Sequence, residues 1–423
     1  MARETASDDV VTVPPPAITV TSEVTLGEHP LPPPPSAATA FGVELADGAY
    51  GASRRAFLVV HQGYGPNVLE MNDGDSVSFG RSSSSTITVD DPRASRNHAR
   101  IFREGPLLYC EDLGSRNGTK VNGASLRDQR RIVVSGDAIR IGICEVFVAS
   151  AIAPSPDDEE GSIGVVVADA KMRDVFALAK QLASTDTSIL VQGEAGVGKK
   201  VVAAQVHRWS PRSAGPLVRM DCTNLTDMSL EGALFGYEGG DGDAAGVLGR
   251  EIGHLEGANG GTLLLDGVGE LSAAGQAKLM AALESRTIVR LGGEARIPID
   301  VRVLGATHRD LPAEVAGKRF REDLYYALSS FTVRVPPLRE RAVEVDLFAH
   351  LFSMSFAARI GQLGAAPNPD AAAALAKYDW PGNVRELRGA LRHAVAATHG
   401  GPITLGSLPD PLRRRLSVRM QVP

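Results

Sequence analysis

The sequence contains little cysteine and no long apolar run. Only three of its 423 residues are cysteines, and they lie far apart at positions 110, 144 and 222. This spacing fits neither a disulfide framework nor a metal-binding CxxC pair, which favours a reducing, cytoplasmic compartment. No apolar run approaches the roughly 18 residues that cross a bilayer, and the N-terminus lacks the basic-then-apolar pattern of a signal sequence. We therefore expect a cytoplasmic protein with no membrane partner.

An excess of basic residues is also missing. Lysine and arginine number 44 against 50 aspartates and glutamates, so the formal net charge is −6. A protein that binds nucleic acid by neutralising its phosphates generally has an excess of basic residues. The acidic balance of this chain disfavours that mode of binding, although it does not exclude a local basic patch. With 43% hydrophobic and 22% charged residues the composition is that of a globular protein, and 423 residues suggest two or three domains.

Proline and glycine mark the first boundaries along the chain. Residues 1–50 carry two proline runs among Ser, Thr and Ala, which predicts a disordered arm, with a proline-rich ligand for a partner domain as the alternative. Residues 51–150 hold short alternating apolar stretches separated by turn residues, and this pattern predicts an all-β sandwich or barrel. An acidic linker is expected over 151–162. The alternating stretches are 56–60, 76–80, 99–102, 107–111, 138–142 and 146–150.

The rest of the chain first alternates between strands and helices and then becomes helical. Over residues 163–335, apolar strand-like runs separated by helical stretches indicate a parallel sheet covered on both faces. Residues 336–402 are predicted to form a helical subdomain whose last helix spans 386–398, followed by a solvated basic tail over 403–423. The strand-like runs are 188–192, 216–220, 262–266 and 300–307, the earlier helices are 172–184 and 275–285, and the arginines of the tail are Arg413, Arg414, Arg415 and Arg419.

Four short motifs follow one another in the β region, and together they resemble the forkhead-associated (FHA) domain. Arg81 brings a planar guanidinium suited to two hydrogen bonds with phosphate oxygens. Ser95 adds a hydroxyl donor, and Asn117 adds an amide that can hold a ligand backbone. The motifs are Gly80-Arg81, SRNH at 95–98, GSRNGT at 114–119 and Asn122-Gly123. The resemblance implies a phosphothreonine-containing protein as partner, contacted by Arg81, Ser95, Arg116 and Asn117, with His98 bracing the loops from inside.

A phosphate-binding loop is predicted after the strand 188–192. The segment GEAGVGKK fits GxxxxGK between a strand and a helix, the context that makes this motif credible. Backbone N–H groups and the helix N-terminus would hold the phosphates, and Lys199 would neutralise the terminal ones. Asp266 ends a later apolar strand, where a carboxylate usually holds Mg²⁺. We therefore expect ATP and Mg²⁺ as cofactors. The loop residues are Gly193, Glu194, Ala195, Gly196, Val197, Gly198, Lys199 and Lys200.

Six segments around this loop look like the AAA+ domain of sigma-54-dependent transcriptional activators. They are LFGYE (234–238), GGTLLLD (260–266), QAKLMAALE (276–284), FREDLYY (320–326), VPPLRER (335–341) and WPGNVREL (380–387). The resemblance covers about residues 163–400. It implies an ATPase ring that remodels sigma-54 RNA polymerase. The expected fold is multidomain: an all-β FHA sandwich followed by an α/β AAA+ P-loop domain with a small all-α lid.

Several positions depart from the pattern of this family. Gly267 stands where the family has the Glu that polarises the attacking water, and general-base help of this kind is worth about 10²–10⁴-fold in rate. The other substituted positions are Asp221 for the Asn that tethers this Glu, His308 for the sensor Asn, Lys200 for a Glu, and Ala327 for one of two arginine fingers.

Other family positions are kept. Arg321 matches the remaining arginine finger, which acts on a neighbouring subunit's site, and Arg385 matches the lid arginine that senses the γ-phosphate. The substituted positions are thus those that act in hydrolysis, whereas the GxxxxGK pattern of the phosphate loop is kept. The resemblance implies an AAA+ ATPase fold with a degenerate catalytic site that binds ATP and forms oligomers with itself or with AAA+ relatives.

The partner-binding segments also differ from the family. Residues 240–245 read GDGDAA where the family carries GAFTGA, the loop that engages sigma-54, so we expect weakened contact with sigma-54 RNA polymerase. Too few residues follow the lid for a helix-turn-helix domain, so direct DNA binding is not expected.

Three hypotheses follow. The first is a phosphothreonine-sensing transcriptional regulator of the sigma-54-interacting AAA+ family that binds ATP but is impaired in hydrolysis and in sigma-54 contact. The second is an active sigma-54-dependent ATPase activator in which the substitutions are compensated. The third is a phosphopeptide-binding scaffold with a vestigial ATPase domain.

Overall fold

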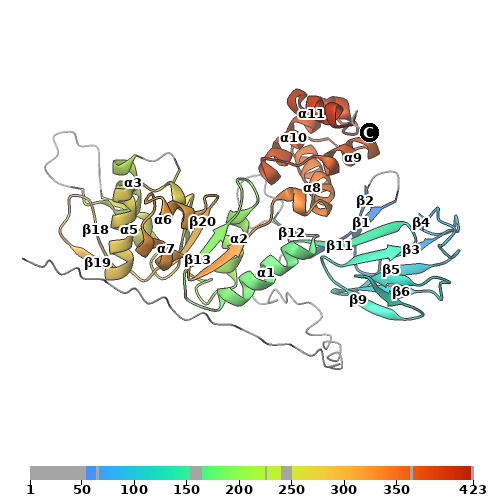
Figure 1. The fold of residues 1–423 in the computed structure, drawn as a ribbon, viewed down its shortest axis with the longest axis horizontal. Coiled ribbons are helices and arrows are strands. Elements are labelled where there is room, and N and C mark those ends of the chain that lie inside the picture. Colours follow the sequence, from blue (N-terminus) through green and yellow to red (C-terminus); the bar gives the residue numbers. More distant parts are fainter. Residues whose placement is uncertain are drawn as a thin grey trace, which may run out of the picture.

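The computed structural model describes residues 54–62, 66–152, 164–223, 226–239, 250–362 and 365–420. It contains a β domain, an α/β core and a helical lid that contacts both (Figure 1). The predicted N-terminal arm and most of the acidic linker lie outside the described residues. The three cysteines are free and buried. Within the described part of the chain, no helix is long and apolar enough to cross a membrane.

The β domain is the predicted sandwich of two sheets. The first has the strand order β2-β1-β11-β10-β7-β8, and the second has the order β4-β3-β5-β6-β9. The first is built from β1 (Arg54–His61), β2 (Pro66–Met71), β7 (Thr119–Val121), β8 (Ala124–Leu126), β10 (Ala138–Ile141) and β11 (Cys144–Ile152). The second is built from β3 (Ser76–Gly80), β4 (Ile87–Thr88), β5 (Ala99–Glu104), β6 (Leu107–Asp112) and β9 (Arg130–Val133).

Strand β1 is buried on both faces. Leu58 and Val60 point into the core between the two sheets, whereas Phe57 and Val59 belong to the hydrophobic cluster of the lid. Successive side chains of a strand point to opposite faces, so a strand covered on one side only would show alternating exposure. The continuous apolar run of β1 therefore reflects a second layer, the lid, packed on the outer face of the sandwich.

The α/β core contains the predicted parallel sheet, with strand order β14-β17-β20-β13-β21. Its strands are β13 (Ile189–Gln192), β14 (Leu217–Asp221), β17 (Thr262–Asp266), β20 (Arg302–Thr307) and β21 (Phe331–Arg334). Two hairpins are attached, β15 (Gly236–Tyr237) with β16 (Glu251–Ile252), and β18 (Thr287–Val289) with β19 (Arg296–Pro298). The helices are α1 (Ala170–Ala183), α2 (Lys199–Arg208), α3 (Asp227–Phe235), α4 (His254–Gly257), α5 (Ala273–Ser285), α6 (Leu311–Ala316) and α7 (Glu322–Leu328), with short 3₁₀ turns η1 (Val268–Glu270) and η2 (Leu338–Glu340).

One strand connects the core to the β domain. Strand β12 (Val165–Val167) pairs antiparallel with β11, with Ser150 opposite Val167, and so extends the first sheet of the sandwich. It leads directly into α1, which begins at an N-cap, Asp169, that accepts a hydrogen bond from Lys171 N. The start of the core is therefore also the edge of the β domain.

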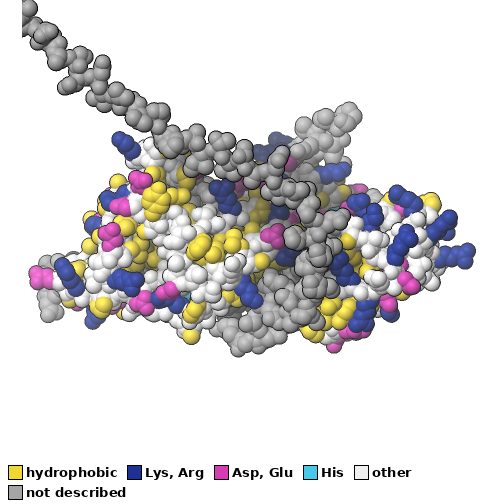
Figure 2. Space-filling view, turned by 60° about the horizontal axis from the view of Figure 1, so that its bottom comes forward, with side chains coloured by type: hydrophobic (Ala, Val, Ile, Leu, Met, Phe, Trp, Pro, Cys, Tyr) yellow, Lys and Arg dark blue, Asp and Glu magenta, His cyan; other side chains and the backbone are white. Residues whose placement is uncertain are grey.

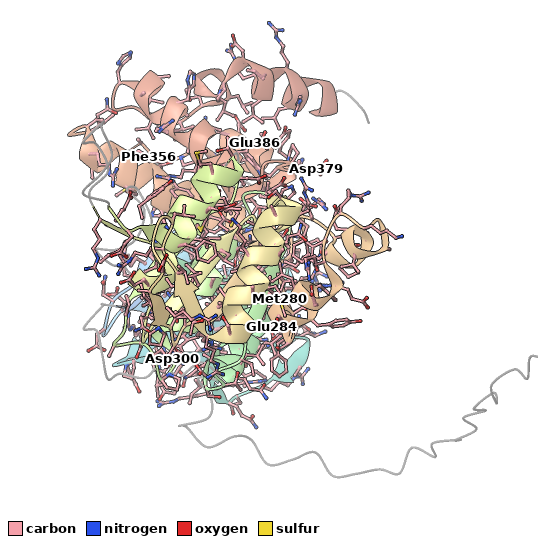
Figure 3. All side chains as sticks on the ribbon, turned by 90° about the vertical axis from the view of Figure 1, so that its left-hand side faces the viewer. Met280, Glu284, Asp300, Phe356, Asp379 and Glu386 are labelled. Atoms are coloured by element: carbon pink, nitrogen blue, oxygen red, sulfur yellow. The ribbon has the colours of Figure 1, made fainter. Side chains whose placement is uncertain are left out.

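The lid consists of helices packed above the core (Figure 3, with Phe356 and Glu386 labelled). They are α8 (Val343–Arg359), α9 (Pro369–Lys377), α10 (Asn383–Thr398), the turn η3 (Leu405–Ser407) and α11 (Asp410–Met420). A tail was expected from residue 403, but α11 is a helix of the lid. Leu408, Leu412 and Leu416 recur every four residues and are buried in the lid core, so the segment packs through one apolar face, while Arg413, Arg414 and Arg415 are exposed.

Helix α8 is also where the lid meets the β domain. Its ring stack of Phe348, Phe352 and Phe356 belongs to the same buried cluster as Phe57 and Val59 of β1. At the edge of this contact His61 Nε2 lies 2.9 Å from Asp346 Oδ2. Burial raises the pKa of Asp346, and the hydrogen bond with His61 opposes that shift.

Candidate functional sites

Three loops meet at one end of the β sandwich and bring together the residues predicted to hold a phosphopeptide. Arg81 follows β3, Ser95 precedes β5, and Arg116 and Asn117 lie between β6 and β7. Arg81 N donates to Ser95 O at 2.9 Å, Arg116 N donates to the Ser95 hydroxyl at 3.0 Å, and Asn117 Nδ2 donates to Arg93 O at 2.7 Å. Since Oγ of Ser95 accepts a bond from Arg116, its own proton is oriented away from that contact and can be donated to a ligand.

His98 lies beneath these loops and connects them. Its side chain is fully buried; Nδ1 accepts a hydrogen bond from Ser95 N at 3.1 Å, and Nε2 lies 3.3 Å from Gly118 O. Accepting at Nδ1 leaves the proton on Nε2, so the ring donates to Gly118 as a neutral imidazole. Gly80 allows the close approach of the loops, because a Cβ there would lie 2.1 Å from Arg96 O.

A buried carboxylate, Asp112, was missed in the sequence and organises the third loop. It accepts hydrogen bonds from Ser115 N and Oγ and from Thr119 N and Oγ1 at 2.6–2.9 Å, and from Asp128 N at 3.3 Å. Burial alone would raise the pKa of Asp112, but these bonds outweigh it and the pKa is lowered. Asp112 therefore fixes the backbone from Ser115 to Thr119, which carries Arg116 and Asn117.

The surface around these loops is basic. The side chains of Arg81, Arg93, Arg96, Arg116 and Arg127 are all exposed there. Several Lys and Arg side chains are visible at the end of the molecule formed by the β domain (Figure 2). Clustered guanidinium groups favour a doubly charged phosphate over a neutral hydroxyl.

In the α/β core, the predicted phosphate loop joins β13 to α2. Gly196 and Gly198 have φ values of +77° and +104°, which only glycine adopts without strain. Lys199 begins α2, and its Nζ donates to the carbonyls of Gly193 and Glu194 at 2.8 Å each. Burial lowers the pKa of Lys199, Asp266 opposes this shift and Arg385 adds to it.

The lid closes onto this loop through specific contacts. Val384 N donates to Gly196 O at 3.1 Å, and a Cβ on Gly196 would lie 2.4 Å from Gly382 O. Glu194 accepts hydrogen bonds from the Arg339 guanidinium at 2.7 and 3.0 Å, and from Asn383 Nδ2 at 3.1 Å. These bonds, that from Arg339 above all, lower the pKa of Glu194. The predicted loop residue Glu194 therefore fastens the lid rather than facing a phosphate.

A cavity of about 240 Å³ lies between the phosphate loop and the lid. Its apolar lining residues, called the apolar compartment below, include Val166, Met172, Phe176, Phe348 and Phe352, and such side chains suit a flat base. Its charged lining residues are the cations Lys199, Lys200, Arg219, Arg341, Arg385 and Arg388 and one carboxylate, Asp266. Arg219, Arg341 and Arg388 were missed in the sequence, because no motif of the phosphate loop includes them.

Asp266 does not present the surroundings of a magnesium ligand. Its Oδ2 lies 3.0 Å from Lys200 Nζ, so an ammonium group occupies the side of the carboxylate where a P-loop hydroxyl and the metal would lie. Lysine offers donors only and cannot coordinate a cation. Among the described residues no group of three or more His, Cys, Asp or Glu is arranged to hold a metal ion. The residues present do not fit the predicted Mg²⁺.

The substituted catalytic positions lie around the ends of β14, β17 and β20. Gly267 has φ +76°, and a Cβ there would lie 2.8 Å from Thr223 Cγ2. Asp221 pairs in register with Asp266 and accepts hydrogen bonds from Thr223 N and Oγ1. His308 Nε2 lies 3.7 Å from Glu270 Oε1, and Glu270 is held by the Arg309 guanidinium.

The two finger positions lie on or beside α7. Arg321 is exposed, its guanidinium forms an ion pair with Asp323 at 2.6 Å, and its N donates to Gln276 Oε1. Ala327 lies on α7 and is partly buried. Neither residue lines the cavity of its own chain. The predicted sigma-54 loop, 240–245, lies outside the described residues.

Comparisons with known proteins agree with this division. The chain matches the sigma-54 interaction domain family over residues 165–334, the FHA domain family over 77–142 and the AAA+ ATPase lid domain family over 339–421. Among curated proteins it is 38% identical to the response regulator protein FleR of Pseudomonas aeruginosa over 261 residues, covering 62% of this chain and 54% of FleR. It is 36% identical to the transcriptional regulatory protein ZraR of Escherichia coli O157:H7 over 274 residues, covering 63% of this chain and 62% of ZraR.

Among solved structures, NtrX from Brucella abortus in complex with ATP aligns with a TM-score of 0.53 at 31% identity, covering 58% of this chain and 54% of NtrX. The chain thus spans 54–62% of the length of these relatives. By these matches, the chain joins an FHA domain to a sigma-54 interaction domain and an AAA+ ATPase lid domain.

Proposed function

We propose that the protein is a phosphothreonine-sensing transcriptional regulator that binds ATP, hydrolyses it poorly and contacts sigma-54 RNA polymerase weakly. The observation that carries this proposal is a contrast between its two sites. In the loops of the FHA domain, the backbones of Arg81 and Arg116 are hydrogen-bonded to Ser95, and the Asn117 amide is hydrogen-bonded to the backbone of Arg93. The end of β17 instead presents Gly267, which has no side chain for activating water.

The FHA half of the proposal rests on donor chemistry. Arg81 and Arg116 supply charged donors, Ser95 supplies a hydroxyl proton, and His98 with Asp112 fixes the backbone that carries them. A phosphorylated threonine adds three acceptor oxygens and about −1.5 to −2 charges. The proposed partner is a phosphorylated protein, with threonine as the modified residue that the match to the FHA domain implies.

The nucleotide half rests on the cavity. It combines an apolar compartment with the phosphate loop, Lys199 and Arg385, which suits binding of ATP. Hydrolysis also needs a group that orients water, and Gly267 and His308 replace the residues that serve this purpose in the family. Glu270 lies close to His308, but its carboxylate already forms an ion pair with Arg309. Arg321 is on the surface, where it can reach a neighbouring subunit in an oligomer.

A titration with a phosphothreonine peptide library tests the FHA half. We expect selected peptides to bind only when phosphorylated, and Arg81→Ala to abolish binding. Arg55→Ala is a matched control, because Arg55 is exposed near the start of β1 and is paired with Glu70 of the neighbouring strand β2. Equal binding of phosphorylated and plain peptides would reject the role of phosphothreonine reader.

Co-purification from the native cell, with and without phosphatase treatment, tests the partner. The proposal expects a protein that is retained by the wild-type chain, lost after phosphatase treatment, and absent with Arg81→Ala. Retention of the same partner after phosphatase treatment would instead favour a scaffold that does not depend on phosphate.

A further inference from the structure

The position of Lys200 determines what kind of nucleotide complex this cavity can hold. Lys200 lies in the first turn of α2, directly after Lys199, where P-loop proteins place the hydroxyl that binds Mg²⁺. The nearest metal-binding candidate on the opposite side is Asp266, at the end of β17. A divalent ion in such a site lies between these two positions.

In this structure that location is bridged by a side chain of the protein. The distance from Lys200 Nζ to Asp266 Oδ2 is 3.0 Å, and both side chains are partly buried at the cavity wall. Lys200 also acts on the carboxylate of the neighbouring strand. Burial would raise the pKa of Asp221, but the Thr223 hydrogen bonds, with smaller contributions from Lys200 and Arg385, leave it lowered. The ammonium group thus contacts the carboxylate of Asp266 and acts electrostatically on that of Asp221, at the end of the adjacent strand.

The charges that line the cavity also favour a metal-free anion over a divalent metal ion. Lys199, Lys200, Arg219, Arg385 and Arg388 all border it, whereas Asp266 is the acidic residue that does so. Mg²⁺ requires oxygen ligands in near-octahedral geometry at about 2.0–2.1 Å, and a lysine beside Asp266 supplies none. A divalent ion would also be repelled by the ammonium group at short range. A polyphosphate without a metal, in contrast, carries its full negative charge and is matched by these cations.

We propose that the Lys200 ammonium takes the place of Mg²⁺, so that the chain binds ATP as the metal-free polyphosphate anion. This inference rests on the proposed nucleotide binding and specifies its chemical form. Because Mg²⁺ in solution binds ATP and competes for it, the sign of the metal effect is diagnostic. A site that uses the metal binds ATP more tightly when Mg²⁺ is added, whereas a site that excludes it does not.

Calorimetric titration of the full chain with ATP, once in EDTA and once in excess Mg²⁺, tests the proposal directly. We expect binding in EDTA to be clearly tighter than in excess Mg²⁺, which removes the metal-free ATP from solution. Binding that Mg²⁺ tightens or leaves unchanged would overturn the proposal while leaving nucleotide binding intact. Absence of binding in both solutions would reject nucleotide binding itself, and this inference with it.

Substitution of Lys200 supplies a second test. In Lys200→Ser a hydroxyl stands beside Asp266, so Mg²⁺ should now tighten ATP binding by about tenfold or more, a change of roughly 1.4 kcal/mol. Lys278→Ser is the matched control and should keep the wild-type metal response, because Lys278 lies on α5, pairs with Glu231 of α3 and does not line the cavity. A Lys200→Ser protein that binds ATP with the same metal response as the wild type would contradict the assignment.

Discussion

At the residue scale, Gly267 explains why the missing glutamate cannot simply be restored. Its φ of +76° lies in the left-handed region, where a side chain costs about 1–2 kcal/mol. A Cβ would also approach Thr223 Cγ2 at 2.8 Å. The backbone at position 267 therefore has a conformation that suits glycine. A glutamate introduced there would not point in the direction needed to activate the water that attacks ATP.

We expect Gly267→Glu to lower the free energy of unfolding by at least about 1 kcal/mol without producing ATP turnover. Chemical denaturation and a phosphate-release assay would measure the two effects. The Gly267→Ala variant separates the effect of backbone strain from that of charge, because alanine adds only a Cβ. We expect this variant to show most of the loss in the free energy of unfolding. Rapid turnover in Gly267→Glu at unchanged stability would show that this account of the site is wrong.

Asp112 carries a pH-dependent part of the stability of the FHA domain. Its pKa is lowered in the folded protein, so it contributes stability that is present above its unfolded pKa of about 3.9 and is lost as the pH falls through the lower folded value. In Asp112→Asn we expect the free energy of unfolding at pH 7 to fall by about 1–3 kcal/mol. The loss should shrink as the pH falls below about 4, measured by denaturation at several pH values. A loss that does not depend on pH would contradict this role.

At the scale of elements, the sequence predicts most of the fold, because alternation and apolar runs survive in the structure. Stretches such as 56–60 and 262–266 became β1 and β17. Short strands such as β4 and β8 carry too few residues for a pattern to show. Helix α11 was missed because arginines dominate its sequence, and its leucines are recognisable as a buried face only once the lid is there to cover them.

The candidate sites were predictable to a similar degree. Contiguous motifs identified the phosphate loop and the FHA loops. The Lys200–Asp266 pair joins residues 66 positions apart (200 and 266), and Arg219 reaches the cavity from a third strand. Pairings of this kind depend on strand order, which a local motif does not contain.

Helix α11 should be required for the stability of the lid. Leu412→Ala removes a side chain that is 6% exposed, and such truncations cost about 2–5 kcal/mol. Arg392→Ala, at an exposed position of α10, should change the stability by less than about 0.5 kcal/mol. Thermal denaturation of both variants checks this. Equal stability of Leu412→Ala and the wild type would mean that the segment does not belong to the lid.

At the scale of the whole molecule, the FHA domain and the nucleotide cavity share walls. Strand β12 pairs with β11 of the sandwich and contributes Val166 to the cavity. Helix α8 contributes Phe348 and Phe352 to the cavity and packs against Phe57 of the sandwich. We therefore expect a change in how the FHA domain packs on the lid to alter the apolar compartment of the nucleotide site.

Two phenylalanines of the FHA domain allow a matched test of this coupling. Phe57 and Phe79 are both fully buried, but Phe57 packs with the lid and Phe79 packs between the two sheets. Each change to alanine should cost about 3–5 kcal/mol of stability. We expect only Phe57→Ala to weaken ATP binding, measured by titration at a temperature where both variants are folded. Equal ATP affinities in the two variants would contradict the coupling.

We infer that the ATPase module binds ATP but hydrolyses it poorly. Steady-state phosphate release, measured with Mg²⁺ present on a preparation whose ATP binding has been established, tests it most directly, with Lys199→Ala as the reference. We predict that the wild-type chain binds ATP and releases phosphate no faster than Lys199→Ala. A wild-type rate that Lys199→Ala abolishes would identify a working ATPase and contradict the claim.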